Sequence, residues 1–160
     1  MKKFILVMII IFAVLITVIP VGCVSKGNAV TSTPWTITIT DSKGKSVEFT
    51  GKDAGKLKIE QISATLKKKD GSEVLQNWKG VLLSDVLKAS GITEFNKIKV
   101  IATDGYEQVF EPAVINDSGT ILGLMLDGKE ITVDEGLVQL VVKSMGGNSW
   151  VRNIKSIVVE

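Results

Sequence analysis

The sequence predicts an α+β domain, a mixed β-sheet with few short helices. Two observations lead to this class. Short segments rich in β-branched residues recur along the chain, and turn sequences such as Asp104-Gly105 separate them. A clear helical signal, by contrast, occurs in one place, after Leu83. Together these observations favour a sheet as the framework, with helices as local additions.

Seven segments are expected to form strands, at residues 35–40, 46–50, 59–67, 98–103, 107–110, 137–143 and 154–159. The first two flank the turn sequence Asp41-Ser42-Lys43-Gly44, which predicts a hairpin. The third has partly apolar faces on both sides, and Asp70-Gly71 ends it. The fourth and fifth flank Asp104-Gly105, one of the stronger hairpin signals. The last two are rich in β-branched residues, which favours central strands.

Helices are expected in two places. Ser84 can cap a helix over residues 85–90, and Gly91 can end it in the left-handed conformation. A single turn is expected over 53–57, where Gly55 lowers the helix propensity.

The N-terminus has the features of a secretory signal. Lys2 and Lys3 precede an apolar run over residues 4–19, which is short for a membrane span of roughly 20 residues. Cys23 follows this run directly after Gly22, and polar residues follow Cys23. The arrangement resembles the bacterial lipobox, in which the Cys is lipidated and becomes the mature N-terminus. We expect a signal peptide over 1–22, a tether over 23–34 and a folded domain over 35–160.

A lipid on Cys23 would hold the protein at the extracytoplasmic side of the cell membrane. Each buried methylene of an acyl chain contributes about 0.8 kcal/mol, and two or three chains suffice for stable anchoring. Two alternatives stay open: the apolar run is an uncleaved anchor, or Cys23 is an unmodified buried residue.

Composition excludes several functions. The 160 residues contain no His and one Cys, so the folded part cannot assemble a zinc site, a Ser-His-Asp triad or a Cys-His pair. Removing Lys2 and Lys3 from the 19 basic residues leaves 17, which equals the 17 acidic residues. Nucleic-acid binding is not expected of a neutral chain with a single Arg. The one basic run, residues 67–69, reads as a solvated strand end, with an anionic-ligand role as the alternative.

Four motifs in order resemble the molybdopterin-binding domain of the sulfite oxidase family. They are Asn77-Trp78-Lys79-Gly80-Val81-Leu82-Leu83-Ser84-Asp85-Val86-Leu87, then Ala102-Thr103-Asp104-Gly105-Tyr106, then Leu126-Asp127-Gly128-Lys129-Glu130-Ile131, and last Trp150-Val151-Arg152-Asn153-Ile154-Lys155-Ser156-Ile157. The similarity extends over about 35–160. It implies the family's fold, an oxidoreductase-like domain, and a cofactor cleft formed by loop segments.

From this resemblance we expect a ligand site in a cleft bordered by three Gly-containing segments. Its residues would be Trp78, Lys79, Gly80, Asp104, Gly105, Tyr106, Gly146, Gly147, Asn148 and Arg152. The two aromatic rings could cover a planar ligand, and the two cations could pair with an anionic group. Each segment also has a structural interpretation, since Trp78 can pack in the core and the glycines can form turns or a plain loop.

The resemblance also implies a molybdenum site bound through a Cys thiolate, which this chain does not supply. After Cys23 it has no thiol, and residues 59–69, where the family places its ligand, offer Ser63 and Thr65 instead. Molybdenum ligation by Cys is therefore excluded, no catalytic or metal-binding residue is assigned, and sulfite oxidation by this chain alone is not expected. Molybdopterin stays possible by resemblance.

Two classes of function remain. In the first, the chain is a membrane-anchored binding module for a small anionic or planar ligand or a partner protein. In the second, it is a redox subunit that binds molybdopterin without a protein thiolate, or completes its site with a redox partner protein. Co-purified molybdenum or pterin would separate the two classes.

Overall fold

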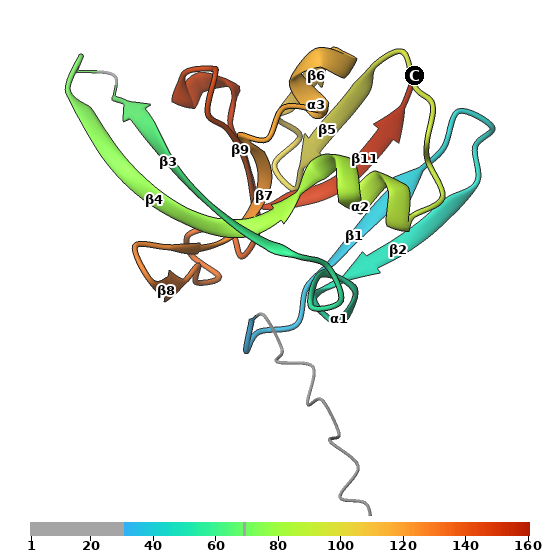
Figure 1. The fold of residues 1–160 in the computed structure, drawn as a ribbon, viewed down its shortest axis with the longest axis horizontal. Helices are drawn as coiled ribbons and strands as arrows, with labels where there is room; N and C mark the ends of the chain where they lie inside the picture. The colour runs from blue at the N-terminus through green and yellow to red at the C-terminus, as the bar shows by residue number, and fades with distance from the viewer. Residues whose placement is uncertain (1–30, 69) are drawn as a thin grey trace, which may run out of the picture.

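A computed structural model describes residues 31–68 and 70–160 (Figure 1). The predicted signal peptide, Cys23 and most of the predicted tether lie outside these residues, as does Lys69. No helix within the described ranges is long and apolar enough to cross a membrane.

The first sheet holds five strands in the order β2-β1-β11-β5-β6. Their bounds are β1 (Thr36–Thr40), β2 (Ser46–Thr50), β5 (Ile98–Ala102), β6 (Glu107–Phe110) and β11 (Ile154–Val159). The β1–β11 pair is parallel and starts at Thr38 opposite Ser156, while the other pairs are antiparallel. The predicted hairpins 35–50 and 98–110 are confirmed.

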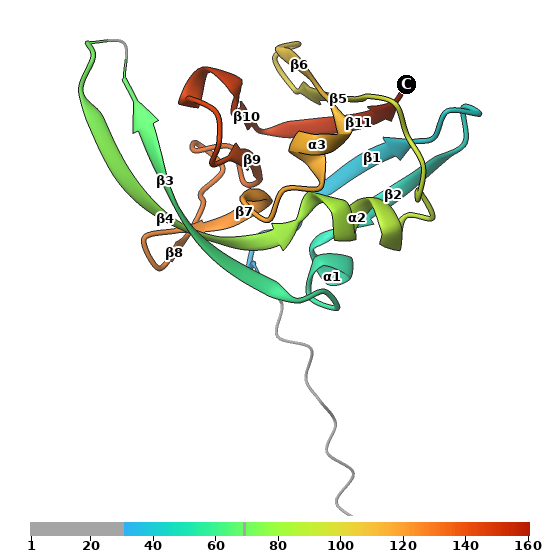
Figure 2. The ribbon, with the colours of Figure 1, turned by 45° about the horizontal axis from the view of Figure 1, so that its top comes forward.

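The second sheet is antiparallel, with the order β10-β9-β7-β4-β3 and β8 added beside β7. Its strands are β3 (Ile59–Lys67), β4 (Glu73–Leu82), β7 (Thr120–Leu126), β8 (Lys129–Glu130), β9 (Gln139–Val142) and β10 (Val151–Arg152). β3 and β4 form a long curved hairpin that extends away from the rest of the domain, and it curves toward the loop after β9 (Figures 1 and 2).

The helices are short: α1 (Gly51–Ala54), α2 (Leu83–Ala89), α3 (Pro112–Ile115) and the 3-10 helix η1 (Gly147–Ser149). The prediction that Ser84 caps α2 is wrong, because β4 runs straight into the helix and the cap position is Leu82. Burial of Leu83 against the core fixes this early start. Gly91, with φ of 81°, ends the helix as predicted. The single turn predicted at 53–57 begins earlier, at Gly51.

A capping box explains the position of α1. The Asp53 carboxylate accepts hydrogen bonds from the Thr50 hydroxyl, at 2.7 Å, and from the Thr50 backbone N–H, at 3.2 Å. Lys56 lies 2.8 Å from the same carboxylate. The hydrogen bond from Lys56, and next those from Thr50, lower the pKa of Asp53 to about 2.

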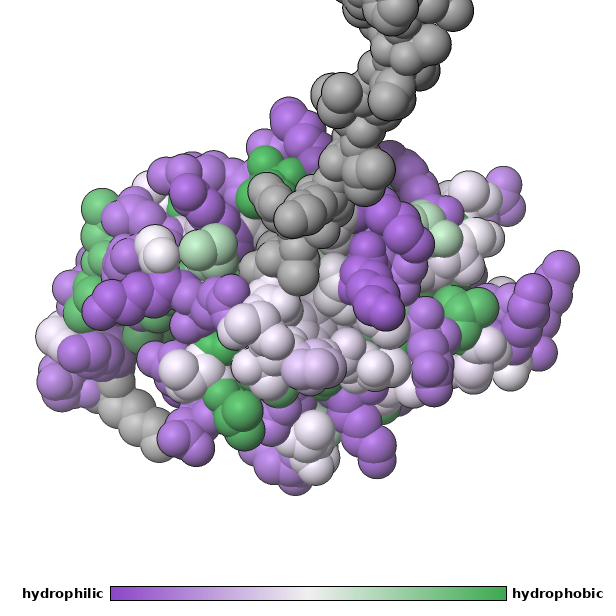
Figure 3. Space-filling view, turned by 90° about the horizontal axis from the view of Figure 1, so that it is seen from below, coloured by the Kyte–Doolittle hydropathy of each residue, from purple (hydrophilic) through white to green (hydrophobic). Residues whose placement is uncertain are grey.

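Inward-facing side chains of the two sheets and of α2 form one core. Its fully buried members include Ile37, Ile39, Leu83, Leu87, Ile121, Leu122, Leu140 and Ile157. On the face seen in Figure 3, hydrophobic side chains are scattered among hydrophilic ones. The folded unit therefore stabilises itself mainly through apolar burial between its layers.

Candidate functional site

The three predicted segments come from different parts of the fold. Trp78 to Gly80 lie within β4, and residues 104–106 form the turn between β5 and β6. Residues 146–150 lie in the connection from β9 to β10, which contains η1, and Arg152 is in β10. The β9–β10 connection is the common element, because it contacts both of the other segments.

Two tryptophans join β4 to this connection. The rings of Trp78 and Trp150 meet edge to face, with centroids 5.9 Å apart and an interplanar angle of 89°. Trp78 is 2% exposed and Trp150 is 5% exposed. The Trp150 indole N–H donates to the Val142 carbonyl at 3.0 Å, which fixes its orientation. Such pairs contribute about 0.5–1.5 kcal/mol beyond their burial, so this contact belongs to the core.

Tyr106 joins the β5–β6 turn to the same connection. Its hydroxyl donates to the Asn148 carbonyl and accepts from the Gln108 amide at 2.8 Å. The Asp104 carboxylate accepts from the Tyr106 backbone N–H at 2.9 Å, and Gly105 has a φ of 86°, so Asp104 and Gly105 form the turn. Tyr106 is 40% exposed, so its ring lies at the surface beside the β9–β10 connection.

The two predicted cations, Lys79 and Arg152, do not share a cavity with Trp78 and Tyr106, the two predicted aromatic residues. Lys79 is exposed and follows Trp78 where β4 pairs with β3 without a register shift, so its side chain lies on the opposite face. Arg152 is exposed at the end of β10, where it pairs with Gln139 of β9. None of Trp78, Lys79, Tyr106 and Arg152 lines either of the two cavities described below.

Two of the predicted glycines allow close packing. A Cβ at Gly80 would collide with the Leu122 carbonyl group of β7, and a Cβ at Gly147 would collide with the Leu66 side chain of β3. Gly146, in contrast, has open space around it. Gly80 thus lets the β4 backbone lie against β7, and Gly147 lets the η1 backbone lie against β3. This packing role requires no ligand.

The inner face of the hairpin is the face that turns toward η1. From β3 it carries Ile62, Ala64 and Leu66, and from β4 it carries Gln76 and Trp78. Ser63 and Thr65 alternate with these residues and point away, both exposed, and the Ser63 hydroxyl donates to Asn77 at 2.8 Å. The two oxygen side chains that the sequence offered in place of a thiolate therefore do not face the inner side.

Two buried polar atoms on the inner face have no hydrogen-bond partner among the described residues. They are the Trp78 Nε1 donor and the Gln76 Oε1 acceptor. Both side chains project from β4 on the same side, two residues apart. An unpaired buried polar atom costs roughly 1–3 kcal/mol, which marks this place as one where a further polar group would be favourable.

A cavity of about 730 Å³ opens between β3 and the loops at the end of the second sheet. Its β3 wall is residues 60–63, and the opposite wall is residues 117–119 with Lys143 and Ser144. Ile62, which pairs with Trp78, links the cavity to the inner face. The volume lies in the range of roughly 300–1,000 Å³ typical of ligand sites. The sequence pattern did not single out this cavity, because its walls come from β3 and two polar loops without a motif.

The charged groups at this cavity are of both signs. Glu60 is paired with Lys58 at 2.7 Å, and Asp117 accepts from the Gly119 backbone N–H. Lys143 adds an exposed cation on the opposite wall. The lining can therefore contact a polar ligand, and it carries charges of both signs.

The described residues offer no protein thiolate to a molybdenum centre. Such a centre takes soft thiolate ligands, and the inner face presents hydrocarbon from Ile62, Ala64 and Leu66. Among residues 31–68 and 70–160, no group of three or more His, Cys, Asp or Glu side chains could hold a metal ion.

Comparison with known proteins supports the fold. A family model described as the oxidoreductase molybdopterin binding domain matches residues 25–160. No curated protein matches the chain. Among solved structures, the sulfane dehydrogenase SoxCD from Paracoccus pantotrophus is similar, with a TM-score of 0.69 and 17% sequence identity over 78% of this chain. The match spans 38% of the solved chain, and at this identity it shows the fold alone.

Proposed function

Because the chain belongs to the oxidoreductase molybdopterin-binding domain family, we propose that it is a membrane-anchored, extracytoplasmic lipoprotein whose domain is a binding module. The module keeps the family's fold and takes a small ligand or a partner protein without molybdenum redox chemistry. Its binding region is the inner face of the β3–β4 hairpin together with the adjoining cavity.

The observation that supports a non-catalytic role is the inner face of β3. The predicted ligand segment places aliphatic side chains there and turns Ser63 and Thr65 outward. The connection after β9 then packs onto this face through Gly147 and Trp150. A soft-metal centre would find no thiolate at that position.

The observation that supports binding is the pair of unsatisfied atoms beside a cavity of ligand size. A planar or polar group reaching the inner face could accept from Trp78 Nε1 and donate to Gln76 Oε1. Lys143 and Asp117, on the far wall, would orient charged parts of the same ligand. The same two atoms favour the second candidate, a redox subunit that holds molybdopterin through hydrogen bonds alone.

One experiment separates the two candidates. The full chain is expressed in a host that makes molybdenum cofactor, purified in detergent, and assayed for molybdenum by mass spectrometry and for pterin by fluorescence. For the binding module we expect far less than one equivalent of either. Stoichiometric pterin or molybdenum would refute the module and support the redox subunit.

The lipid anchor has its own test. Mass spectrometry of the membrane fraction should find an acylated N-terminal Cys23. A Cys23→Ala chain should lose the acyl mass and leave the membrane fraction. If that variant keeps the same mature mass and stays membrane-bound, the apolar run itself is the anchor.

A further inference from the structure

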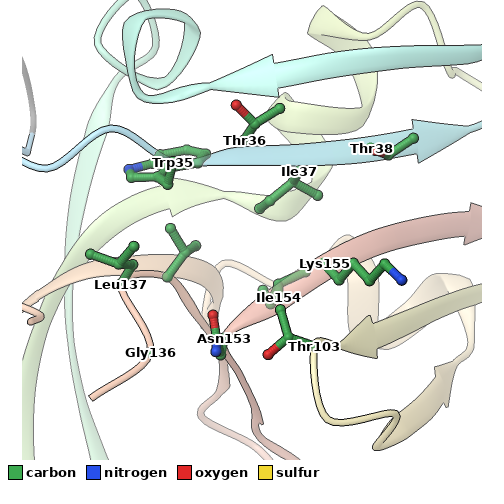
Figure 4. Close-up of a pocket in the computed structure, with 11 residues that line it drawn as sticks. Trp35, Thr36, Ile37, Thr38, Thr103, Gly136, Leu137, Asn153, Ile154 and Lys155 are labelled. Carbon is green, nitrogen blue, oxygen red and sulfur yellow. The ribbon is translucent and has the colours of Figure 1, made fainter. Parts of the chain in front are cut away.

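A second cavity lies between the first sheet and the loop that precedes β9, and none of its lining residues belongs to the β3–β4 hairpin. It has a volume of about 330 Å³ and opens where β1 and β11 separate (Figure 4). The parallel pairing of these strands starts at Thr38 and Ser156, so Thr36 and Ile154, two residues earlier in the same register, are not paired with each other. The cavity is the space between these unpaired ends of β1 and β11.

The cavity has a polar group and an apolar group of lining side chains. Thr36, Thr38, Thr103, Asn153 and Lys155 supply three hydroxyls, a carboxamide and an ammonium. Trp35, Ile37, Leu137, Val138 and Ile154 supply the apolar surface. Among the eleven lining residues, Lys155 alone is charged, and its side chain is exposed.

The backbone around the cavity adopts rarely populated conformations. Three non-Gly residues of the described chain have positive φ, and two of them, Leu137 at 48° and Asn153 at 50°, line this cavity. Left-handed residues cost free energy and gather at functional sites. Gly136 allows the arrangement, because it has a φ of 99° and a Cβ there would lie 2.8 Å from the Asn153 nitrogen.

Lys155 lies at a β-bulge in β11. The register between β11 and β5 shifts between Ile154 and Ser156, which makes Lys155 the extra residue. Bulges of this kind re-aim side chains beside binding sites. The Asn153 carbonyl accepts from the Thr103 backbone N–H at 3.0 Å, which joins the residue after β5 to the residue before β11 on one wall.

We infer that this cavity binds a small carboxylate with an apolar body. The ammonium of Lys155 would pair with the carboxylate, and the Thr hydroxyls and the Asn153 amide would donate to its oxygens. The apolar body would lie against Trp35 and Leu137. The volume is near the lower limit for ligand sites, which favours a compact molecule. This site is separate from the hairpin and does not rest on the proposed function.

The test is equilibrium dialysis of the full chain, in detergent, against radiolabelled benzoate, propionate or inorganic phosphate. We expect one equivalent of at least one carboxylate to bind saturably. Lys155→Met should weaken that binding about tenfold or more, since it removes the charge and keeps the aliphatic stem. The control is Lys43→Met, an exposed lysine in the β1–β2 turn of the same sheet, which should stay within twofold of wild type.

Two further measurements sharpen the result. Thr103→Val replaces a lining hydroxyl with a methyl group and should weaken carboxylate binding several-fold, and uncharged benzamide should not compete. The inference is overturned if neither carboxylate binds saturably, if phosphate alone binds, or if the Lys155 and Lys43 variants lose equal affinity. Co-purified pterin leaves this outcome unchanged, so the two proposals fail independently.

Discussion

Replacing Gly80 by Ala should strongly destabilise the domain. A Cβ at this position would collide with the Leu122 carbonyl oxygen and lie 2.7 Å from the carbonyl carbon. Both atoms are backbone of the central strand β7, so no flexible side chain can move aside. β4 and β7 must therefore separate locally, next to the register shift between Lys79 and Gly80.

The cost can be worked from this geometry. Local separation of the strands weakens about two ladder hydrogen bonds, each worth roughly 1 kcal/mol net. Overpacking of a buried site adds about 1–3 kcal/mol. The free energy of unfolding should thus fall by about 3–5 kcal/mol, a large part of the roughly 5–15 kcal/mol that holds a domain folded.

Urea unfolding followed by tryptophan fluorescence measures this loss, as a midpoint about 1–3 M lower. Gly146→Ala is the matched control, because Gly146 has open space and a φ of −68°. The control should stay within about 0.5 kcal/mol of wild type. A Gly80→Ala chain within 1 kcal/mol of wild type would show that β4 and β7 are not packed this closely.

Three further comparisons of variants test other parts of the fold, each by urea or thermal unfolding. Trp150→Phe should cost about 1–3 kcal/mol more than Trp78→Phe, because it strips the Val142 carbonyl of a 3.0 Å hydrogen bond while Trp78 Nε1 has no partner to lose; equal losses would contradict this. The pKa of Asp53 is about 2 in the folded chain and roughly 3.9 in the unfolded chain. The ionised carboxylate therefore stabilises the fold fully at neutral pH, and this stabilisation is lost as the pH falls through 2. Asp53→Asn should therefore cost less than about 1 kcal/mol at pH 7, since the side chain is 36% exposed, and progressively less as the pH falls through 2; a cost that does not shrink over this range would refute the assignment. At Asn153, with φ of 50°, Ala should be about 1 kcal/mol less stable than Gly, and the reverse order would argue against a left-handed backbone there.

The strands could be predicted where sequence pattern and turn chemistry agree. Residues 46–50, 59–67, 107–110 and 154–159 form strands with the predicted bounds. β7 was missed, because its residues 120–124 are buried without alternation and no turn dipeptide marks its start. α2 was displaced at its start because tertiary burial of Leu83 outweighs a Ser cap.

The candidate site could be predicted in part. Motif order brought together the three segments that meet around residues 146–152, through the Trp78–Trp150 and Tyr106–Asn148 contacts. Motif order does not determine which face of β4 a side chain occupies, so the opposite orientations of Trp78 and Lys79 needed the register of the sheet. Both cavities were missed because their walls combine strand residues with loop residues that are distant in the sequence.

The motif residues that carry the family resemblance are explained here by packing. Trp78 meets Trp150 edge to face, Gly80 lies against the β7 backbone, and Gly147 lies against Leu66. These contacts hold the hairpin, β7 and the β9–β10 connection together whether or not a cofactor is present. A chain with these residues can therefore build the family's fold without the family's thiolate, and its function must be sought in the groups that packing does not use. Those groups are the unpaired Trp78 and Gln76 atoms and the polar side chains between β1 and β11.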